Sequence, residues 1–310
     1  MITSIFSKSR PINYILITTL LVLCFLLFQF KTSYSDISTF EIAKKGVLLL
    51  ILIGSLFVTN FITKKNGLSK DNSYTFFFFF VFLILFPNTL SNPNLIISNA
   101  LILLALRRLI SMQSLITPKE KIFDACLWIF IACLFNFWCI LFILLVFASI
   151  VFHVSRDYRN WIIPFIALGI VATITTMGAL IFKPEFIFDF YKKGVVDFNL
   201  NHIQNIFQNV AIVIYIITAF IAFVTMLFIL PKKLSNLHSS YRKVIFAFII
   251  GLAIYFISPN KENDLLIYTF VPTAIMLTNY LETIKKFWIK ESIVGIITLA
   301  GLITYILQIL

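Results

Sequence analysis

The sequence predicts an all-α fold, a polytopic membrane bundle in which residues 1–310 form a single transmembrane domain. Sixty per cent of the residues are apolar and 12% are charged, and the mean hydropathy is +1.00. A water-soluble globule of this composition would have too few polar side chains to cover its surface. The bilayer is therefore the solvent in which we expect this chain to fold.

Apolar runs divide the chain into about eleven segments that can cross the bilayer. A helix needs about 20 apolar residues to do so, and shorter runs suffice where the helix tilts or the bilayer thins. The expected spans are residues 12–30, 46–63, 74–91, 94–110, 122–136, 137–153, 160–182, 209–230, 242–258, 264–281 and 292–310. The first run is too long for a signal peptide and has no small-residue cleavage site, so we expect an uncleaved span. Residues 183–208 form the largest expected external loop.

Basic residues predict the orientation, because Lys and Arg concentrate in cytoplasmic loops. With the N-terminus inside, 18 of the 25 basic residues fall in inside loops and 7 fall outside. This split requires residues 122–153 to form two short helices that break near Asn136, Phe137 and Trp138. A single span there would turn every later basic loop outward. The C-terminus is then predicted to lie outside.

The other features of the composition exclude several classes of protein. The net charge of +12 indicates no nucleic-acid partner, because the basic loops account for it. The four Cys residues lie within apolar runs, where thiols are expected to be buried and unreactive. The three His residues, His153, His202 and His238, lie on separate segments, whereas zinc and iron sites need several ligands that converge. We expect no metal site and no cofactor.

Two acids in the first outer loop are candidate catalytic residues. Asp36 and Glu41 lie between the first two spans. An enzyme that uses a lipid-held donor needs a general base close to the membrane to take the proton from an acceptor hydroxyl. The five-residue separation of these acids differs from the tight acidic pair that is usual in polyprenyl-dependent glycosyltransferases.

The large outer loop mixes aromatic side chains with acids, amides and the adjacent cations Lys192 and Lys193. One interpretation is an interfacial stretch with its aromatics at headgroup depth. The other is a lid over an outer cavity, in which the two lysines bind a lipid phosphate. On the inner side, Arg107 and Arg108 end the fourth span. They are expected to extend to lipid headgroups, and the alternative is a phosphate-binding role.

Polar side chains and prolines also interrupt the apolar runs. Pro87 and Pro93 are expected to stop the helices on either side of the uncharged, Asn-rich hairpin 86–94, which forms a tight turn or hydrogen-bonds a sugar. Within the span 160–182, three Thr residues are expected to face other helices, and Gly169 and Gly178 suit close helix packing.

Four segments carry a resemblance to a family of polytopic inner-membrane proteins of Bacteroidota that has no established activity. They are the opening residues 1–11, the stretch 94–108 that ends in Ala-Leu-Arg-Arg, the block 157–161 and the late motif 260–263. The likeness covers essentially the whole chain. More loosely, the spans within 94–153 are similar to polyprenyl-linked glycosyltransferases and O-antigen polymerases.

We therefore expect a multi-pass protein of the bacterial inner membrane that contacts membrane lipids. The best-supported hypothesis is the handling of lipid-linked saccharide at the outer face, with a polyprenyl-phosphate carrier as partner. The alternative is a non-catalytic subunit of an envelope complex, bound to other membrane proteins, or a transporter. An outer carboxylate in a lipid-accessible cavity would favour the first hypothesis over the second.

The charge distribution gives a testable topology. Single-cysteine probes at Asn92 and Gln204 are expected to react with a membrane-impermeant reagent in intact cells, because both loops are predicted to be outside. Probes at Gly67 and Ser235 are expected to react only after the cells are opened. Labelling of Ser235 in intact cells would overturn the orientation.

Overall fold

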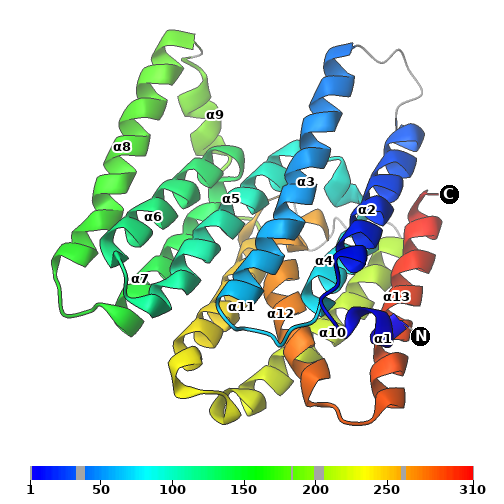
Figure 1. The fold of residues 1–310 in the computed structure, drawn as a ribbon. Coiled ribbons are helices and arrows are strands. Elements are labelled where there is room, and N and C mark those ends of the chain that lie inside the picture. The colour runs from blue at the N-terminus through cyan, green and yellow to red at the C-terminus, as the bar shows by residue number, and fades with distance from the viewer. Residues whose placement is uncertain (1, 33–38, 183, 199–205, 260–262, 310) are drawn as a thin grey trace.

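The computed structural model describes residues 2–32, 39–182, 184–198, 206–259 and 263–309. This part of the chain is a bundle of helices and turns without strands, which confirms the predicted all-α class (Figure 1). The α-helices are α1 (Ile2–Phe6), α2 (Pro11–Thr32), α3 (Thr39–Lys65), α4 (Tyr74–Leu85), α5 (Pro93–Ile110), α6 (Pro118–Phe135), α7 (Ile143–His153), α8 (Arg159–Phe182), α9 (Phe186–Lys192), α10 (Ile206–Ile229), α11 (His238–Ile257), α12 (Ile267–Thr283) and α13 (Phe287–Ile309). The 3-10 helices are η1 (Pro87–Leu90), η2 (Ser111–Ser114), η3 (Phe137–Phe142), η4 (Leu230–Lys232), η5 (Ser235–Leu237) and η6 (Asn263–Leu266).

Eight helices in the described part are long and apolar enough to cross a membrane, which identifies the chain as a membrane protein by helix length and composition. They include α2, α3, α5, α8, α10, α11, α12 and α13. Two further apolar helical stretches, Tyr74–Leu85 and Phe137–His153, are shorter.

The helix ends follow the turn chemistry of the sequence. Helix α4 ends at Leu85 and α5 begins at Pro93, so the two prolines of the hairpin bound these helices as predicted. The side chain of Asn92 caps α5 by accepting a hydrogen bond from the backbone N–H of Leu95 at 3.4 Å.

A break at Asn136 separates α6 from η3 and α7. Its backbone is extended, with φ −135° and ψ 111°, and its side-chain oxygen accepts a hydrogen bond from the backbone N–H of Trp138 at 3.3 Å. Asn136 thus ends one helix and caps the next. The predicted break within residues 122–153 is confirmed.

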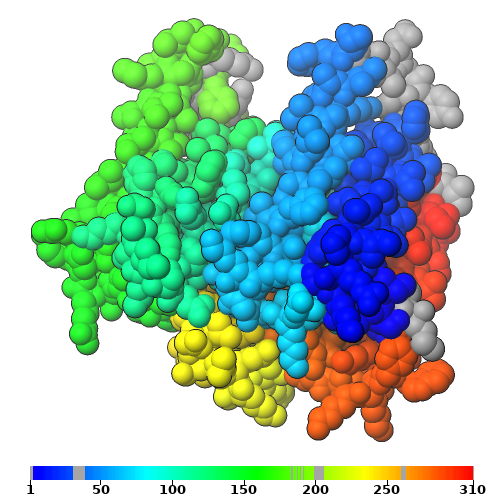
Figure 2. All heavy atoms as spheres, in the orientation of Figure 1, coloured from blue at the N-terminus to red at the C-terminus, as the bar shows by residue number. Residues whose placement is uncertain are grey.

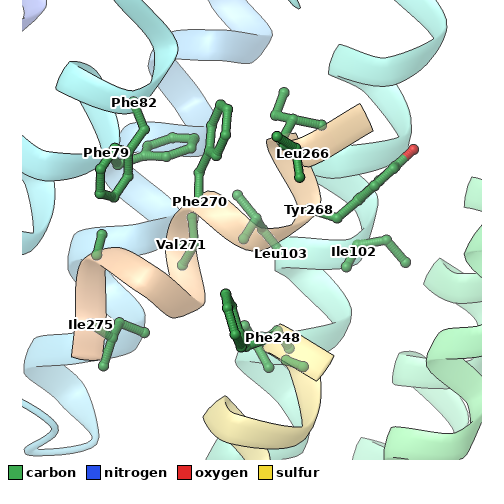
Figure 3. Close-up of a cluster of buried hydrophobic side chains, with 14 of the residues drawn as sticks. Phe79, Phe82, Ile102, Leu103, Phe248, Leu266, Tyr268, Phe270, Val271 and Ile275 are labelled. Atoms are coloured by element: carbon green, nitrogen blue, oxygen red, sulfur yellow. The ribbon is translucent and has the colours of Figure 1, made fainter. Parts of the chain in front are cut away.

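Helix α12 runs through the core of the bundle. Its apolar stretch is 94% buried, and it packs against α4, α5, α10 and α11. Figure 3 shows Phe82 of α4, Leu103 of α5 and Phe248 of α11 around Phe270 and Val271 of α12. Helix α4, with its run of five Phe residues, is buried along its whole length. Aromatic side chains therefore fill the space between these helices.

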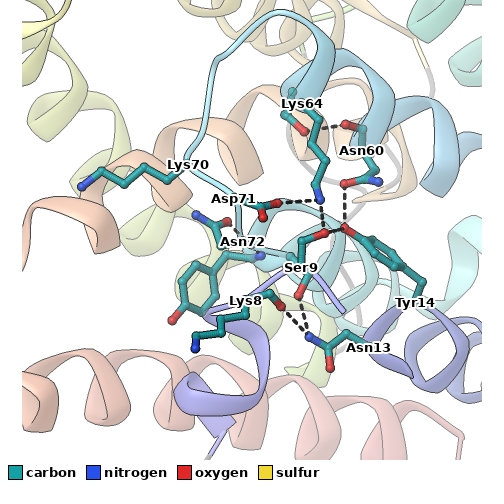
Figure 4. A network of polar contacts seen from close by, with 12 residues as sticks. Lys8, Ser9, Asn13, Tyr14, Asn60, Lys64, Lys70, Asp71 and Asn72 are labelled. Carbon is teal, nitrogen blue, oxygen red and sulfur yellow. Dashed lines mark hydrogen bonds and ion pairs between the residues drawn. The ribbon is translucent and has the colours of Figure 1, made fainter. Parts of the chain in front are cut away.

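A polar network ties the N-terminal segment to the loop that follows α3 (Figure 4). The amide of Asn13 donates to the hydroxyl of Ser73 at 3.2 Å, and the hydroxyl of Tyr14 donates to the side-chain oxygen of Asn60 at 3.3 Å. An ion pair of 3.2 Å joins Lys64 to Asp71. These contacts fix the entry of α2 against the end of α3.

Helix α8 corrects two expectations. Its apolar stretch is only 17% buried, and the hydroxyls of Thr173 and Thr176 donate to carbonyls of α8 itself, at 2.8–3.1 Å. A Cβ added at Gly169 or Gly178 would meet nothing within 4 Å. Close packing at these two glycines is therefore a wrong prediction within this chain, because α8 contacts the bundle mainly through α6 and α7.

Figure 2 shows the molecule hollowed at the top of the view, between α8 and α3. Short helix α9 returns from the end of α8 along one side of this hollow, towards the ends of α5 and α6 (Figure 1). The hollow thus separates two projecting helices and gives access to the ends of shorter ones.

The contact of α11 with α12 yields a stability prediction. A Cβ at Gly251 would lie 2.6 Å from Cγ2 of Thr269 and 3.3 Å from its backbone N. Thr269 is held in place because its hydroxyl is 2.6 Å from the hydroxyl of Tyr215 and donates to the carbonyl of Leu266 at 2.6 Å. Gly251→Ala is expected to lower the free energy of unfolding by about 1–2 kcal/mol, since overpacking outweighs the gain in helix propensity.

Unfolding of the purified protein in detergent, followed by circular dichroism, measures this change. Gly54→Ala in α3 is the matched control, because a Cβ at Gly54 meets nothing within 4 Å. It gains helix propensity alone and is expected to be stabilising by about 0.5–1 kcal/mol. Equal effects of the two substitutions would contradict the packing argument.

Candidate functional site

A polar cavity of about 490 Å³ lies where α5 and η6 begin and where α6, α9 and α11 end. Segments from five parts of the chain line it. The lining residues are Asn92, Asn94, Leu95, Phe135, Asn136, Phe137, Trp138, Lys192, Lys193, Ser258, Pro259, Asp264 and Leu265. We call it the headgroup cavity.

Asp264 is the carboxylate of the headgroup cavity. It is 2% exposed and lies in η6, the turn that leads into α12. The side-chain amide of Asn92 donates to its carboxylate at 3.2 Å. Because Asn92 also caps α5, the start of α5 and the start of α12 are held together at this cavity. A carboxylate that is both buried and hydrogen-bonded has a fixed position beside the cavity.

A chain of hydrogen bonds fixes the part of the cavity wall that contains Asn136. The amide of Asn136 donates to the hydroxyl of Tyr268 at 2.9 Å, and this hydroxyl is 2.6 Å from the hydroxyl of Ser98. Tyr268 and Ser98 are buried. The break between α6 and η3 is thereby locked to α5 and α12.

Lys192 and Lys193 supply positive charge. Lys192 is the last residue of α9, and both side chains are exposed. The backbone N–H of Asp197, a little further along, donates to the carbonyl of Ile257 at 3.2 Å, which ties this segment to the end of α11. Two ammonium groups on a tethered segment can pair with one phosphate as point charges.

The indole of Trp138 has an unused donor. Its Nε1 is buried and has no hydrogen-bond partner among the described residues, although most buried donors in proteins are paired. Trp138 lines the headgroup cavity.

An apolar groove of about 220 Å³ adjoins the headgroup cavity. The two spaces share Phe137, and helix α9 contributes to both of them, with Phe186 and Phe190 in the groove and Lys192 in the cavity. Helices α6 and α8 form the other walls, and the lining residues are Phe130, Cys133, Leu134, Phe137, Ile140, Leu168, Val171, Ala172, Thr175, Thr176, Phe186 and Phe190. We call it the chain groove.

The rings of α9 close over the chain groove. The ring centroids of Phe137 and Phe190 are 5.2 Å apart in an edge-on arrangement, and those of Phe186 and Phe190 are 6.3 Å apart. Such contacts hold α9 against η3. A polar cavity and an apolar groove that meet at one ring suit an amphiphile, whose charged group and hydrocarbon chain need different surroundings.

The structure brings only some of the predicted site residues together. Lys192 and Lys193 line the headgroup cavity, whereas Arg107 and Arg108 lie in the last turn of α5, at the other end of the bundle. Glu41 is exposed in the first turn of α3 and is not among the residues that line the cavity. Asp36 lies outside the described residues.

Asp264 is the residue that sequence reasoning missed. Apolar runs show no sign of where a loop folds back into the bundle, so the sequence argument considered only Asp36 and Glu41. The available signal was its position directly before a span rich in Thr, next to Asn263. Acids in such positions either cap a helix or enter the protein interior.

Within the described part of the chain, no group of three or more His, Cys, Asp or Glu residues is arranged to hold a metal ion. His153 has instead a basic neighbour, since its Nε2 is 3.0 Å from Nζ of the buried Lys243. The imidazole of His238 lies 2.9 Å from the carbonyl of Lys233. His202 lies outside the described residues.

Comparison with known proteins gives a family but no activity. The model of one protein family matches residues 1–310, and that family is described as one of unknown function. No curated protein matches the chain. No solved structure matches it either.

The hydrogen bonds of Tyr268 give a prediction for the cavity wall. Tyr268→Phe removes the hydroxyl that joins Ser98 to Asn136, and side-chain hydrogen bonds in membrane proteins average about 0.6 kcal/mol each. The substitution is expected to lower the free energy of unfolding in detergent by about 1 kcal/mol. Tyr280→Phe in the same helix is the control, because the hydroxyl of Tyr280 makes no hydrogen bond to a described residue. Equal stabilities of the two variants would contradict the proposed wall.

Proposed function

The chain belongs to the DUF6427 family, a family of unknown function, and we propose that it binds a lipid-linked saccharide through the phosphate of its carrier. The observation that carries this proposal is the junction of the headgroup cavity, with two lysines and a carboxylate, and the chain groove. Lys192 and Lys193 take the phosphate, the Asn side chains and Asp264 hydrogen-bond the saccharide, and the groove receives the polyprenyl chain.

The proposal includes a membrane topology. The eight long helices, the two shorter apolar stretches and α6 together give eleven segments. With the N-terminus on the cytoplasmic side of a bacterial inner membrane, the start of α5 and the end of α9 face outward, and so does the headgroup cavity. The excess of Lys and Arg in the opposite loops supports this orientation.

The headgroup cavity contains both a carboxylate and two ammonium groups, and this combination supports a glycosyl transfer. A general base takes the proton from the acceptor hydroxyl, the new glycosidic bond forms, and the bond between the sugar and the carrier phosphate breaks. The two lysines stabilise the phosphate that leaves. Asp264 lines the cavity, so we propose it as the base in preference to Asp36 and Glu41.

The second candidate is a non-catalytic subunit of an envelope complex, or a transporter. The largely exposed apolar surface of α8 favours it, because such a surface contacts either lipid or a partner protein. The buried carboxylate of the headgroup cavity favours the first candidate, since a subunit needs no carboxylate beside an apolar groove.

Binding of farnesyl phosphate to the full chain in neutral detergent tests the proposal. The double substitution Lys192→Ala and Lys193→Ala is expected to weaken binding at least about tenfold, because it removes the charge-assisted contacts to the phosphate. Lys44→Ala with Lys45→Ala is the matched control, an adjacent pair in the first turns of α3 and outside the cavity lining. Isothermal titration calorimetry measures all three proteins.

Two further measurements separate the parts of the site. Ala172→Phe fills the chain groove and is expected to weaken the binding of both farnesyl phosphate and farnesol, whereas the lysine substitutions affect farnesyl phosphate alone. In cells, Asp264→Asn is expected to abolish function, since loss of a general base costs about 10²–10⁴-fold in rate, while Asp36→Asn and Glu41→Gln retain it. Unchanged farnesyl phosphate binding in the lysine variant would refute the phosphate site, and full function of Asp264→Asn would leave only the non-catalytic candidate.

A further inference from the structure

A second charged cavity, of about 480 Å³, lies at the opposite end of α5 from the headgroup cavity. Three helices and a loop form it. The lining residues are Phe61, Lys65, Asn66, Arg107, Arg108, Ser111, Gln113, Ser114, Ile116 and Lys121. We call it the basic cavity. The 18 residues of α5 separate the two sites by about 27 Å, at 1.5 Å per residue.

Four cations from three helices converge on the basic cavity, and among the described residues only one of them has a carboxylate partner. Arg108 pairs with Asp124 of α6 at 2.9 Å. Lys65, Arg107 and Lys121 form no ion pair with a described carboxylate. Unpaired like charges at close range repel one another. An anion in the cavity would remove that repulsion.

The ring of Phe61 holds two of these cations on one wall. The guanidinium carbon of Arg107 is 4.4 Å from the ring centroid, and Nζ of Lys65 is 5.0 Å from it. Helix-end arginines are ordinarily explained by the helix dipole and by contact with lipid headgroups. That explanation also covers Lys65, which lies in the last turn of α3, but it does not account for Lys121, which lies near the start of α6.

The loop between α5 and α6 contributes Ser114 and Ile116 to the cavity and has a strained backbone. Leu115 and Thr117 have left-handed backbones, with φ of 53° and 44°, which is costly for residues other than glycine. Nζ of Lys121 donates to the carbonyl of Ser111 and to the hydroxyl of Ser114, both at 2.8 Å. Lys121 thus holds the strained loop and brings its charge to the cavity.

Exposed apolar side chains adjoin these charges. Leu115 is 57% exposed and Ile116 is 67% exposed, and they lie on the same loop. Cations beside exposed apolar side chains are typical of a surface that meets the headgroup layer of a membrane. We propose that the basic cavity binds a phosphate group, carried by an anionic phospholipid or by a soluble phosphate compound, independently of the headgroup cavity.

The test uses the full chain in neutral detergent and three probes: dioctanoyl phosphatidylglycerol, dioctanoylglycerol and inorganic phosphate. The substitutions Lys65→Gln and Arg107→Gln remove two cations and leave the loop contacts of Lys121 intact. They are expected to weaken phosphatidylglycerol binding about 25-fold, roughly fivefold for each basic residue near an anionic lipid. Microscale thermophoresis measures the affinities, and the thermal midpoint of each variant checks that it is folded.

Arg156→Gln with Arg159→Gln is the matched control. It removes one cation from the turn between α7 and α8 and one from the first residue of α8, both outside the cavity lining. It is expected to change binding less than about twofold. Inorganic phosphate that competes with the lipid identifies a soluble compound as a ligand, and phosphate that fails to compete identifies the phospholipid. Equal binding of dioctanoylglycerol and phosphatidylglycerol, or equal losses in the two charge variants, would overturn the proposal.

Farnesyl phosphate binding at the headgroup cavity is expected to persist in both variants. The result for the basic cavity therefore does not decide the result for the headgroup cavity.

Discussion

The bundle depends on one constraint: a helix buried among other helices in a bilayer must find protein partners for its polar side chains. Helix α12 meets this constraint through polar contacts with α10 and α4. Its Thr269 and Thr273 contact Tyr215 of α10 at 2.6 and 3.0 Å, and Thr278 contacts Thr75 of α4 at 3.0 Å. These bonds set how α12 sits in the core, and so they also set where η6, with its carboxylate, meets the ends of α5 and α6.

The sequence alone predicted those parts of the fold that depend on the chemistry of a single turn. Proline and asparagine determine the helix ends at Pro87, Pro93 and Asn136, because they act on the backbone of their own turn. The roles of threonines were not predictable in this way. Thr269 joins α12 to α10, whereas Thr173 of α8 is exposed and bonds only to its own helix. Both lie in apolar, threonine-containing runs, so the difference depends on which neighbours are present, and a single sequence does not contain that information.

The candidate site shows the same division. Charge sorting predicted that the hairpin and the lysine pair lie on one side of the membrane, and the cavity contains residues from both of them. The distribution of charge along the chain does not say which residues lie close together in space. The sequence argument favoured Asp36 and Glu41, because acids in a first outer loop can be recognised from the sequence. The depth of Asp264 depends on the fold of η6 against Asn92, 172 positions away in the sequence.

Helix α5 connects the two charged cavities, and its dipole has opposite effects at its two ends. At its start, the unpaired backbone N–H groups add positive potential to the headgroup cavity, which favours anions. Asp264 already uses part of that potential, so a phosphate entering there needs both lysines. At its end, where exposed carbonyls favour cations, Nζ of the buried Lys243 accompanies the two arginines and donates to the carbonyl of Leu109 at 2.5 Å. The dipole therefore favours the arginines at that end, and Lys65 and Lys121 add the charge that a bound phosphate would balance, whereas in the headgroup cavity Lys192 and Lys193 supply the positive charge.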